Sequence, residues 1–308
     1  MSTVPLLNGI WEYVFCTWGR SPSNTEQTKC KDVERAVRKA IDASAKLKTR
    51  NIKVFTQGSY ANRTNVRQDS DVDICVLCND VFFTNCDMSE VLDNTVLGFS
   101  DAQSQYADFK NDLEAALKSH FGKDSVTRGK KAFDVHANAN TYRADADVVP
   151  CFEHRHFVGT PQNNRFFSGT RLLSDDGKSI INWPCQNYQN GVDKNNATGR
   201  RFKAIVRILK SLRYEMIDNG YTIAKSIPSY LLECLVWNVP NECFGHDEYR
   251  ADVRCALAHL CNETRADGTC KEWGEINDLK YLFRQSQSWT RKQVNEFLNA
   301  AWTYIGFK

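Results

Sequence analysis

The chain has 308 residues, of which 40 are Lys or Arg and 37 are Asp or Glu, so its formal net charge is only +3. This balance excludes a protein that binds nucleic acid through bulk positive charge, and any basic surface must come from local clustering. A hydrophobic content of 42% and an aromatic content of 11% exclude intrinsic disorder and supply enough core for two lobes.

The first half of the chain alternates between helical and strand-like segments. The apolar spacing predicts three helices, over residues 6–18, 25–49 and 101–121. Strands are expected over residues 51–59, 71–78, 131–136 and 143–152, the last two paired through a turn at 137–140. In the second of these strands Val72, Ile74 and Val76 are expected to face the core.

The second half of the chain changes from strand-like to helical sequence. Residues 157–183 are strand-like but irregular, and helices are predicted over residues 198–219, 228–238, 249–261 and 290–305. The run from 187 to 196 is rich in Asn and Gly and is expected to be the boundary. We therefore divide the chain into a mixed α/β lobe with N-terminal helices (1–190) and a helical lobe (191–308).

The twelve cysteines are scattered without the spacing of a disulfide framework. The N-terminal sequence lacks a secretory signal and no stretch approaches the length of a membrane span, so we expect free thiols and a cytoplasmic protein. Near the C-terminus only Cys243 and His246 approach a zinc-site spacing, and no second pair matches them. We expect no zinc, with Cys255 and His259 at ordinary positions of an amphipathic helix.

One motif carries most of the functional information. Gln57, Gly58 and Ser59 stand at the end of a strand, and Asp71 and Asp73 follow a dozen residues later on a second strand. Residues two apart on a strand point to the same face, so both carboxylates can hold the same metal ions. Two carboxylates beside a loop of backbone N–H groups suit a nucleoside triphosphate with Mg²⁺. The pattern predicts a nucleotidyltransferase.

Phosphoryl transfer with two Mg²⁺ ions, for which Mn²⁺ can substitute, generally uses three carboxylates. Asp134, Asp145 and Asp147 are the candidates for the third. We favour Asp147, because it precedes the apolar run 148–150, where a lone carboxylate would be costly without a cation. Asp145 points to the same face and is a candidate for a residue that contacts the metal ligands without binding the metals itself.

The helical lobe offers cations and a hydroxyl for the phosphates. Basic residues recur at three- and four-residue steps, at Arg200, Lys203, Arg207 and Lys210. A solvated face is the ordinary interpretation of such a stripe. A triphosphate nevertheless needs cations, so we expect Lys203 and Lys210 to contact donor phosphates. Ser229 and Tyr230 open the next helix, where the hydroxyl of Ser229 is expected to bind phosphate and Tyr230 to stack on a base.

These residues resemble the bacterial CD-NTase family, the cyclic oligonucleotide synthases related to animal cyclic GMP–AMP synthase and oligoadenylate synthase. The similarity extends over roughly residues 50–240, and its blocks are residues 57–65, 70–74, 147–151, 194–210 and 227–231. It implies an α+β fold, in which a polymerase-β-like nucleotidyltransferase lobe with a mixed β-sheet packs on a helical lobe, with the active site in the cleft between them. It implies Mg²⁺ ligands at Asp71, Asp73 and Asp147, and donor-triphosphate contacts at Ser59, Lys203, Lys210 and Ser229.

The resemblance also implies an activity. Family members join two or three ribonucleoside triphosphates into a cyclic messenger that activates a partner effector during phage infection, the signalling known as CBASS. The sequence has no inserted zinc ribbon and no long basic DNA-binding platform like that of the animal sensor. We therefore expect no nucleic-acid activator and no membrane partner.

Two other classes of function fit parts of the same pattern. A template-independent nucleotidyltransferase would use the same carboxylates to extend RNA or a small-molecule acceptor, although an RNA acceptor calls for a long basic groove that the even charge disfavours. A nucleotide-binding module without catalysis would retain the triphosphate site alone, which three carboxylates and Ser59 argue against.

Overall fold

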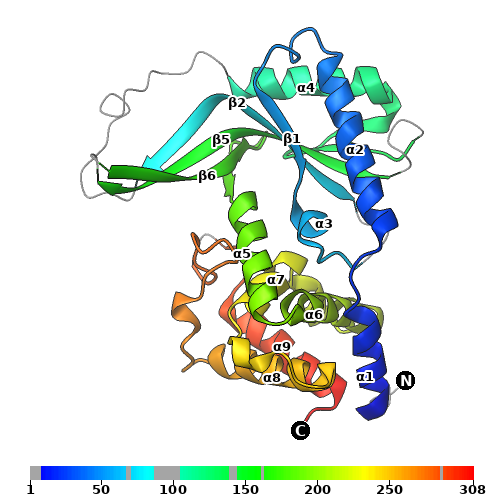
Figure 1. The fold of residues 1–308 in the computed structure, drawn as a ribbon, viewed down its shortest axis with the longest axis vertical. Coiled ribbons are helices and arrows are strands. Elements are labelled where there is room, and N and C mark those ends of the chain that lie inside the picture. The colour runs from blue at the N-terminus through cyan, green and yellow to red at the C-terminus, as the bar shows by residue number, and fades with distance from the viewer. Residues whose placement is uncertain (1–7, 67–70, 87–104, 139–143, 161–162, 285–286) are drawn as a thin grey trace. The chain divides into compact units, whose positions relative to one another are not determined.

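The computed structural model describes residues 8–66, 71–86, 105–138, 144–160, 163–284 and 287–308 (Figure 1). Backbone contacts divide the chain into two compact units. The sheet unit comprises Ser23–Ala61 and Arg67–Cys185, as far as these residues are described. The helical unit comprises the chain up to Pro22, the short segment Asn62–Val66 and the whole of Gln186–Lys308.

The sheet unit is built on one mixed, seven-stranded sheet. Five strands lie in the order β1 (Ile52–Thr56), β2 (Val72–Cys86), β5 (Ala146–Thr160), β4 (Phe133–Val135) and β3 (Val126–Arg128). The far half of β5 pairs with β6 (Asn163–Leu173), which pairs with β7 (Ser179–Asn182). Among the described strands, β2 and β5 are the one parallel pair, and the other pairings are antiparallel. The mixed sheet that the sequence predicted is confirmed.

Two long helices cover one face of this sheet. These are α2 (Asn24–Asp42) and α4 (Tyr106–Phe121), which pack against each other and against the strands (Figure 1). A capping box between Ser23 and Glu26 starts α2. The apolar residues of both helices join those of the strands in one buried core, in which Ile74 is fully buried and Val72 nearly so. The predicted core face of β2 is therefore confirmed.

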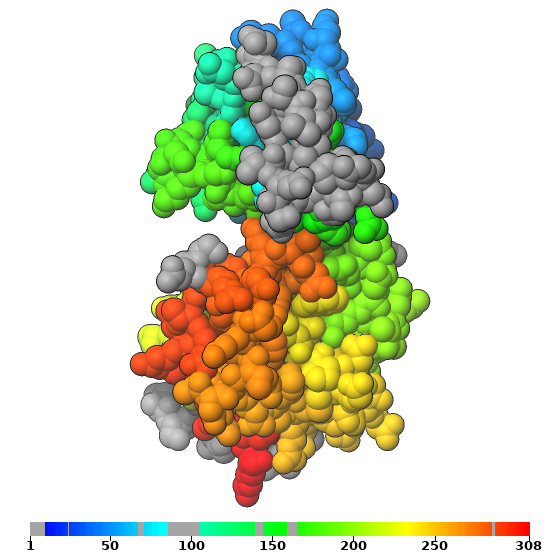
Figure 2. Space-filling view, turned by 90° about the vertical axis from the view of Figure 1, so that its left-hand side faces the viewer, coloured from blue at the N-terminus to red at the C-terminus, as the bar shows by residue number. Residues whose placement is uncertain are grey.

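The helical unit has a separate core. Its helices are α1 (Asn8–Trp18), α5 (Pro184–Ala197), α6 (Arg201–Asp218), α7 (Ser229–Trp237), α8 (Tyr249–Glu263) and α9 (Arg291–Ile305). The segment between α8 and α9, drawn in orange, covers one side of this unit (Figure 2). Among the described residues, no helix combines the length and apolarity that crossing a membrane requires.

The division into lobes differs from the expected one in two places. The N-terminal helix α1 belongs to the helical unit, because Trp11 and Phe15 are buried in its core. The run 187–196, expected as a boundary loop, is helical and lies within α5. Contacts with a distant segment account for this, since the amide of Asn190 donates to the carbonyl oxygen of Ile276 at 2.8 Å. The helix predicted over 25–49 is also shorter, because α2 ends at Asp42.

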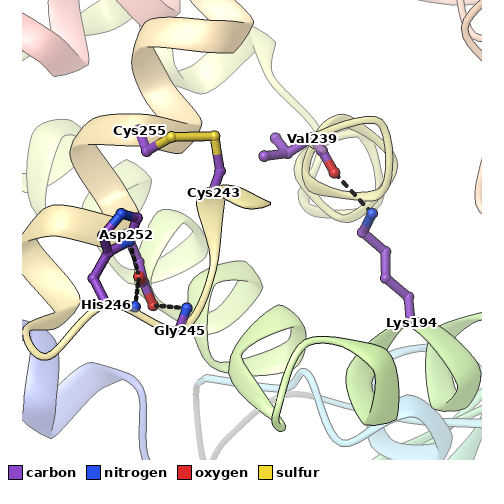
Figure 3. The surroundings of a disulfide bond; sticks show 7 residues. All are labelled: Lys194, Val239, Cys243, Gly245, His246, Asp252 and Cys255. Carbon is purple, nitrogen blue, oxygen red and sulfur yellow. Dashed lines mark hydrogen bonds and ion pairs between the residues drawn. A yellow bond between two sulfur atoms is a disulfide. The ribbon is translucent and has the colours of Figure 1, made fainter. Parts of the chain in front are cut away.

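The expectation of free cysteines is wrong for one pair. Cys243 and Cys255 form a disulfide that joins the 3-10 turn η4 (Asn241–Cys243) to α8 (Figure 3). His246 lies three residues after Cys243 and forms a hydrogen bond with the buried carboxylate of Asp252, with 2.7 Å between Nδ1 and Oδ1. The two cysteines are therefore joined in a disulfide, and His246 is engaged in a hydrogen bond.

The burial of α1 gives a test of the division into units. Phe15 is fully buried in the core of the helical unit, whereas Tyr13 is 73% exposed on the same helix. We expect Phe15→Ala to lower the free energy of unfolding by about 3–5 kcal/mol because it leaves a cavity. Tyr13→Ala, the matched control, is expected to change it by no more than about 0.5 kcal/mol. Urea denaturation followed by tryptophan fluorescence measures both, and equal small effects would contradict the assignment of α1 to this core.

Candidate active site

The predicted phosphate turn and the first predicted metal ligands are adjacent in the sheet unit. The backbone N–H of Gln57 donates to the carbonyl oxygen of Asp73 at 2.8 Å. Gly58 begins the one-turn helix α3 (Gly58–Asn62) with a φ of +66°, and a Cβ at this position would lie 2.2 Å from Oδ2 of Asp73. Only glycine allows this backbone conformation and this close approach to the carboxylate.

A row of three carboxylates crosses the middle of the sheet. The parallel register of β2 and β5 places Asp73 opposite Asp147, and the antiparallel register of β4 and β5 places Asp134 opposite Asp147. Register partners point to the same face of a sheet, and Asp71 lies two residues before Asp73 on that face. Of the three acids considered for the third position, Asp147 is therefore the one directly opposite Asp73.

The crowding of these acids changes the ionisation of Asp147. Burial, a hydrogen bond with Asp134, and the nearby charges of Asp73 and Asp71 raise the pKa of Asp147 from its ordinary 3.8 to about 7. Both burial and like charges disfavour the ionised carboxylate. A divalent cation among these groups would remove the repulsion, so the donor set suits a hard cation such as Mg²⁺.

A cavity of about 220 Å³ opens beside this row of acids. Its polar lining includes Asp71, Asp134, His136, Asp145 and Asp147. The carboxylate of Asp145 is partly used within the protein, since it accepts a hydrogen bond from the N–H of Ala137 at 2.7 Å. In the described part of the chain, no three Asp, Glu, His or Cys side chains already form a closed metal site. A cation would therefore have to draw these carboxylates together.

The helical unit places the predicted cations in different surroundings. The ammonium of Lys210 is 3% exposed and donates to the Thr64 hydroxyl at 3.1 Å, to the Thr64 carbonyl oxygen at 3.2 Å and to Glu233 at 3.2 Å. Because an ammonium has three donors, this set already satisfies Lys210, and this part of the basic stripe is not a solvated face. Arg207 is also buried and donates to the backbone oxygens of Gly19 and Arg63.

Lys203 differs from Arg207 and Lys210, two other cations of α6, whose side chains donate hydrogen bonds within the protein. Its ammonium lies 5.7 Å from the ring centre of Tyr188, and the structure records no hydrogen bond or ion pair for this ammonium among the described residues. Burial lowers the pKa of Lys203, and the carboxylate of Glu233 opposes this effect. An anionic ligand would compensate the buried charge, so Lys203 keeps the capacity to bind phosphate.

The two residues at the start of α7 have distinct environments. Ser229 is partly exposed, and the capping position before it is Pro228, which has no side-chain hydrogen bond. Tyr230 is held by its hydroxyl, which donates to Glu275 at 2.9 Å and lies 3.3 Å from Oδ1 of Asn187. Burial and the charge of Glu275 raise the pKa of Tyr230, and its ring packs against the core of the helical unit.

Sequence reasoning gave no role to Glu233 and treated Asp134 only as an alternative ligand. Both had a detectable signal. Glu233 is the one acid within the apolar run from Leu231 to Val236, where a carboxylate needs a buried partner. Asp134 lies between two buried apolar residues on a short strand, so its side chain points to the face that carries the other acids.

Comparison with known proteins agrees with this geometry. The sequence pattern of the "Nucleotidyltransferase domain" family matches residues 37–128, and that of the "cGAS/DncV-like nucleotidyltransferase C-terminal helical domain" matches residues 189–306. The chain is 47% identical to the cyclic dipyrimidine nucleotide synthase CdnE of Legionella pneumophila over 96% of this chain and 98% of that protein. This chain belongs to the CD-NTase family. It is 40% identical to the synthase of the same name from Cecembia lonarensis, over 94% and 97% of the two chains.

Solved structures support the same CD-NTase assignment. The Elizabethkingia meningoseptica CdnE cyclic dinucleotide synthase, solved with GTP and Apcpp, matches with a TM-score of 0.79 and 34% identity over 96% of this chain and 99% of that one. The Rhodothermus marinus CdnE c-UMP-AMP synthase, solved with Apcpp and Upnpp, matches with a TM-score of 0.82 and 28% identity over 96% and 98%. The predicted family, the nucleotidyltransferase lobe with a mixed sheet and the helical C-terminal lobe are confirmed, and the protein is an enzyme of CD-NTase type.

The contact between Gly58 and Asp73 gives a direct test of this site. We expect Gly58→Ala to lower nucleotidyltransferase turnover by about 100-fold or more, because the added methyl displaces the Asp73 carboxylate. Gly177→Ala is the matched control, since Gly177 has a φ of +82° but nothing within 4 Å of an added Cβ. Both variants should lose about 1–2 kcal/mol of stability from backbone strain. Equal turnover in the two variants would show that the close approach does not matter for activity.

The raised pKa of Asp147 predicts a dependence of stability on pH. Between pH 4 and 7 the folded chain binds more protons at Asp147 than the unfolded chain, so this carboxyl contributes less stability as pH rises. In EDTA at pH 8 we expect Asp147→Asn to raise Tm by about 2–4 °C, and we expect the difference to shrink as pH falls and to be small at pH 4. Calorimetry across this range measures the effect. A variant that is less stable than the native chain at pH 8 would contradict the proposed repulsion.

Proposed function

We propose that this enzyme joins two ribonucleoside triphosphates into a cyclic dinucleotide with release of pyrophosphate. The observation that carries the proposal is the register of β2 and β5, which places Asp147 directly opposite Asp73 on the sheet face that also carries Asp71. The similarity to cyclic nucleotide synthases over nearly the whole chain supports the same reaction.

Asp71, Asp73 and Asp147 are the proposed ligands of two Mg²⁺ ions, or of Mn²⁺ in their place. When bound, such ions supply charge neutralisation for the reacting phosphates and activation of the attacking hydroxyl. The three carboxylates, in their ionised form, contribute the negative charge that would hold the ions. Asp145 accepts a hydrogen bond from the backbone N–H of Ala137, and it is proposed to support the wall of the cavity.

The donor triphosphate is proposed to bind the turn from Gln57 to Ser59. Gly58 allows a close approach of the backbone, and the hydroxyl of Ser59 is the proposed donor to the β- and γ-phosphates. In the helical unit, Lys203 and Ser229 are the proposed phosphate contacts. Lys210 is proposed to act through Thr64, since its three donors are engaged within the protein.

Base contacts are proposed from the helical unit. Tyr230 is the proposed platform for base stacking, with its ring held in place by the hydrogen bond to Glu275. Pyrimidines are the proposed bases of the product. Support comes from the relatives at 47% and 40% identity, both named cyclic dipyrimidine nucleotide synthases, whereas the relative named a cyclic dipurine synthase is 35% identical.

The proposed biological setting is CBASS signalling against phage in the bacterial cytoplasm, where ribonucleoside triphosphates are made. In this setting the product would activate a partner effector that recognises the cyclic nucleotide. The support is the membership of the CD-NTase family, and no nucleic-acid activator is included in the proposal.

The reaction can be tested with the purified enzyme, Mg²⁺ and the four labelled ribonucleoside triphosphates. We expect a phosphatase-resistant product whose mass fits a cyclic dinucleotide and which needs UTP or CTP. A product that forms only after RNA or a small acceptor is added would replace cyclisation with a tail-adding reaction. A purine-only product would keep cyclisation and contradict the proposed base choice.

Substitution of one proposed metal ligand tests the catalytic assignment. We expect Asp73→Asn to lower product formation by about 100-fold or more while the fold is retained, because a neutral amide holds a divalent cation poorly. Asp124→Asn, at an exposed position of the same unit, is the matched control and should keep full activity. Product formation by Asp73→Asn at the rate of the control would contradict the metal assignment.

A further inference from the structure

A buried ion pair in the helical unit has a specific structural partner. Lys210 and Glu233 are 3% and 4% exposed, and their charged groups lie 3.2 Å apart. Replacing such a pair with apolar residues is often neutral or stabilising, so an ion pair of this kind is weak evidence for a role in stability alone. The other contacts of the pair indicate what it holds.

Both groups converge on one short stretch of chain. Oε1 of Glu233 accepts from the Asn62 side-chain amide at 3.1 Å, and Oε2 accepts from the Thr64 hydroxyl at 3.0 Å. Lys210 donates to the hydroxyl and to the carbonyl oxygen of the same Thr64. Asn62 and Thr64 are themselves buried, at 7% and 0% exposure. Lys210 and Glu233 therefore fix both the side chains of Asn62 and Thr64 and the backbone at Thr64.

The residue between them is held in an uncommon conformation. Arg63 has a φ of +58°, which is unfavourable for a residue with a Cβ. Its carbonyl oxygen accepts a hydrogen bond from Arg207 at 2.8 Å. Such conformations persist where the surroundings over-determine them. Residues 62–64 thus form a rigid segment whose shape is imposed by α6 and α7.

This segment is continuous with the proposed phosphate-binding turn. Asn62 is the last residue of α3, three residues after Ser59. A helix of five residues is too short to keep its orientation by itself. Gly58 is fixed at one end by its contact with Asp73 and by its own backbone conformation. The other end is fixed by Glu233 through Asn62.

We infer that Glu233 is a positioning residue for the reaction, which acts with Lys210 through Asn62 and Thr64 to hold α3 so that Ser59 meets the donor phosphates. The inference rests on the proposed function, because it takes Ser59 as a phosphate contact. Glu233 touches neither nucleotide nor metal in this scheme. Its effect reaches the substrate through three residues of continuous chain.

A double-mutant cycle between Glu233 and Ser59 tests the inference. Glu233→Gln keeps the side-chain shape and one acceptor, but a neutral amide oxygen holds Asn62, Thr64 and Lys210 less strongly. The probes are UTP with an α,β-imido bridge, ATP with an α,β-methylene bridge, and the monophosphates UMP and AMP, with affinities measured by calorimetry. We expect Glu233→Gln to weaken triphosphate-analogue binding about tenfold and to leave monophosphate binding unchanged. In a Ser59→Ala background the same substitution should cause little further loss.

A second variant and a matched control separate positioning from general destabilisation. Thr64→Val removes only the hydroxyl that links Glu233 and Lys210, leaves their ion pair in place, and should reproduce the coupling to Ser59 if Glu233→Gln does not fold. Asp252→Asn is the control, because Asp252 is a fully buried carboxylate of the same unit that holds Gly245 and His246. We expect this control to lower Tm without changing the affinity for the triphosphate analogues.

The outcomes distinguish this inference from the proposed function. Losses at Glu233 and Ser59 that simply add would overturn the positioning role and leave Ser59 as a phosphate contact. A Ser59→Ala variant that binds the analogues as the native chain does would overturn both. Equal losses for triphosphate and monophosphate probes would also contradict the inference, because the proposed effect is confined to the β- and γ-phosphates.

Discussion

Repulsion among carboxylates in one row of the sheet is the constraint on which the rest of the structure depends. Asp73, Asp147 and Asp134 are register partners on three adjacent strands, and burial and charge raise the pKa of the middle one to about 7. The strands stay paired because their opposite face is apolar, with Ile74 and Val148 fully buried under the two long helices. The core thus holds the acids in an arrangement in which ionisation of Asp147 is unfavourable. A divalent cation would stabilise the ionised form.

The sheet and its acids could be predicted because the side-chain period of a strand is two. Alternation of acids with Val and Ile in residues 71–76 fixed both faces of β2, and the observed burial agrees. The choice of the third acid depended on register, which a single sequence does not contain. Asp134, Asp145 and Asp147 all lie on or beside strands, and the parallel pairing with β2 is what distinguishes Asp147.

The helical unit was harder to predict, because a basic stripe at helical spacing does not show which of its cations are buried and bonded within the protein. The polar partners of α6 come from segments distant in sequence: Gly19 for Arg207, and Thr64 for Lys210. Helix α5 was missed for a similar reason, since Asn190 donates to the carbonyl oxygen of Ile276, a residue distant in sequence. Composition also says nothing of which cysteines meet, and the pair of Cys243 and Cys255 is set by the packing of η4 against α8.

The ion pair of Lys210 and Glu233 shows how a fold can favour geometry over stability. An apolar pair of the same volume would fill the space and avoid the desolvation of two charges. An apolar pair would, however, be compatible with many conformations of the segment from Asn62 to Thr64. The charged pair is satisfied only when the Asn62 amide, the Thr64 hydroxyl and the Thr64 carbonyl oxygen all point inward. Because an unpaired buried charge is costly, this requirement selects one conformation of the segment that follows Ser59.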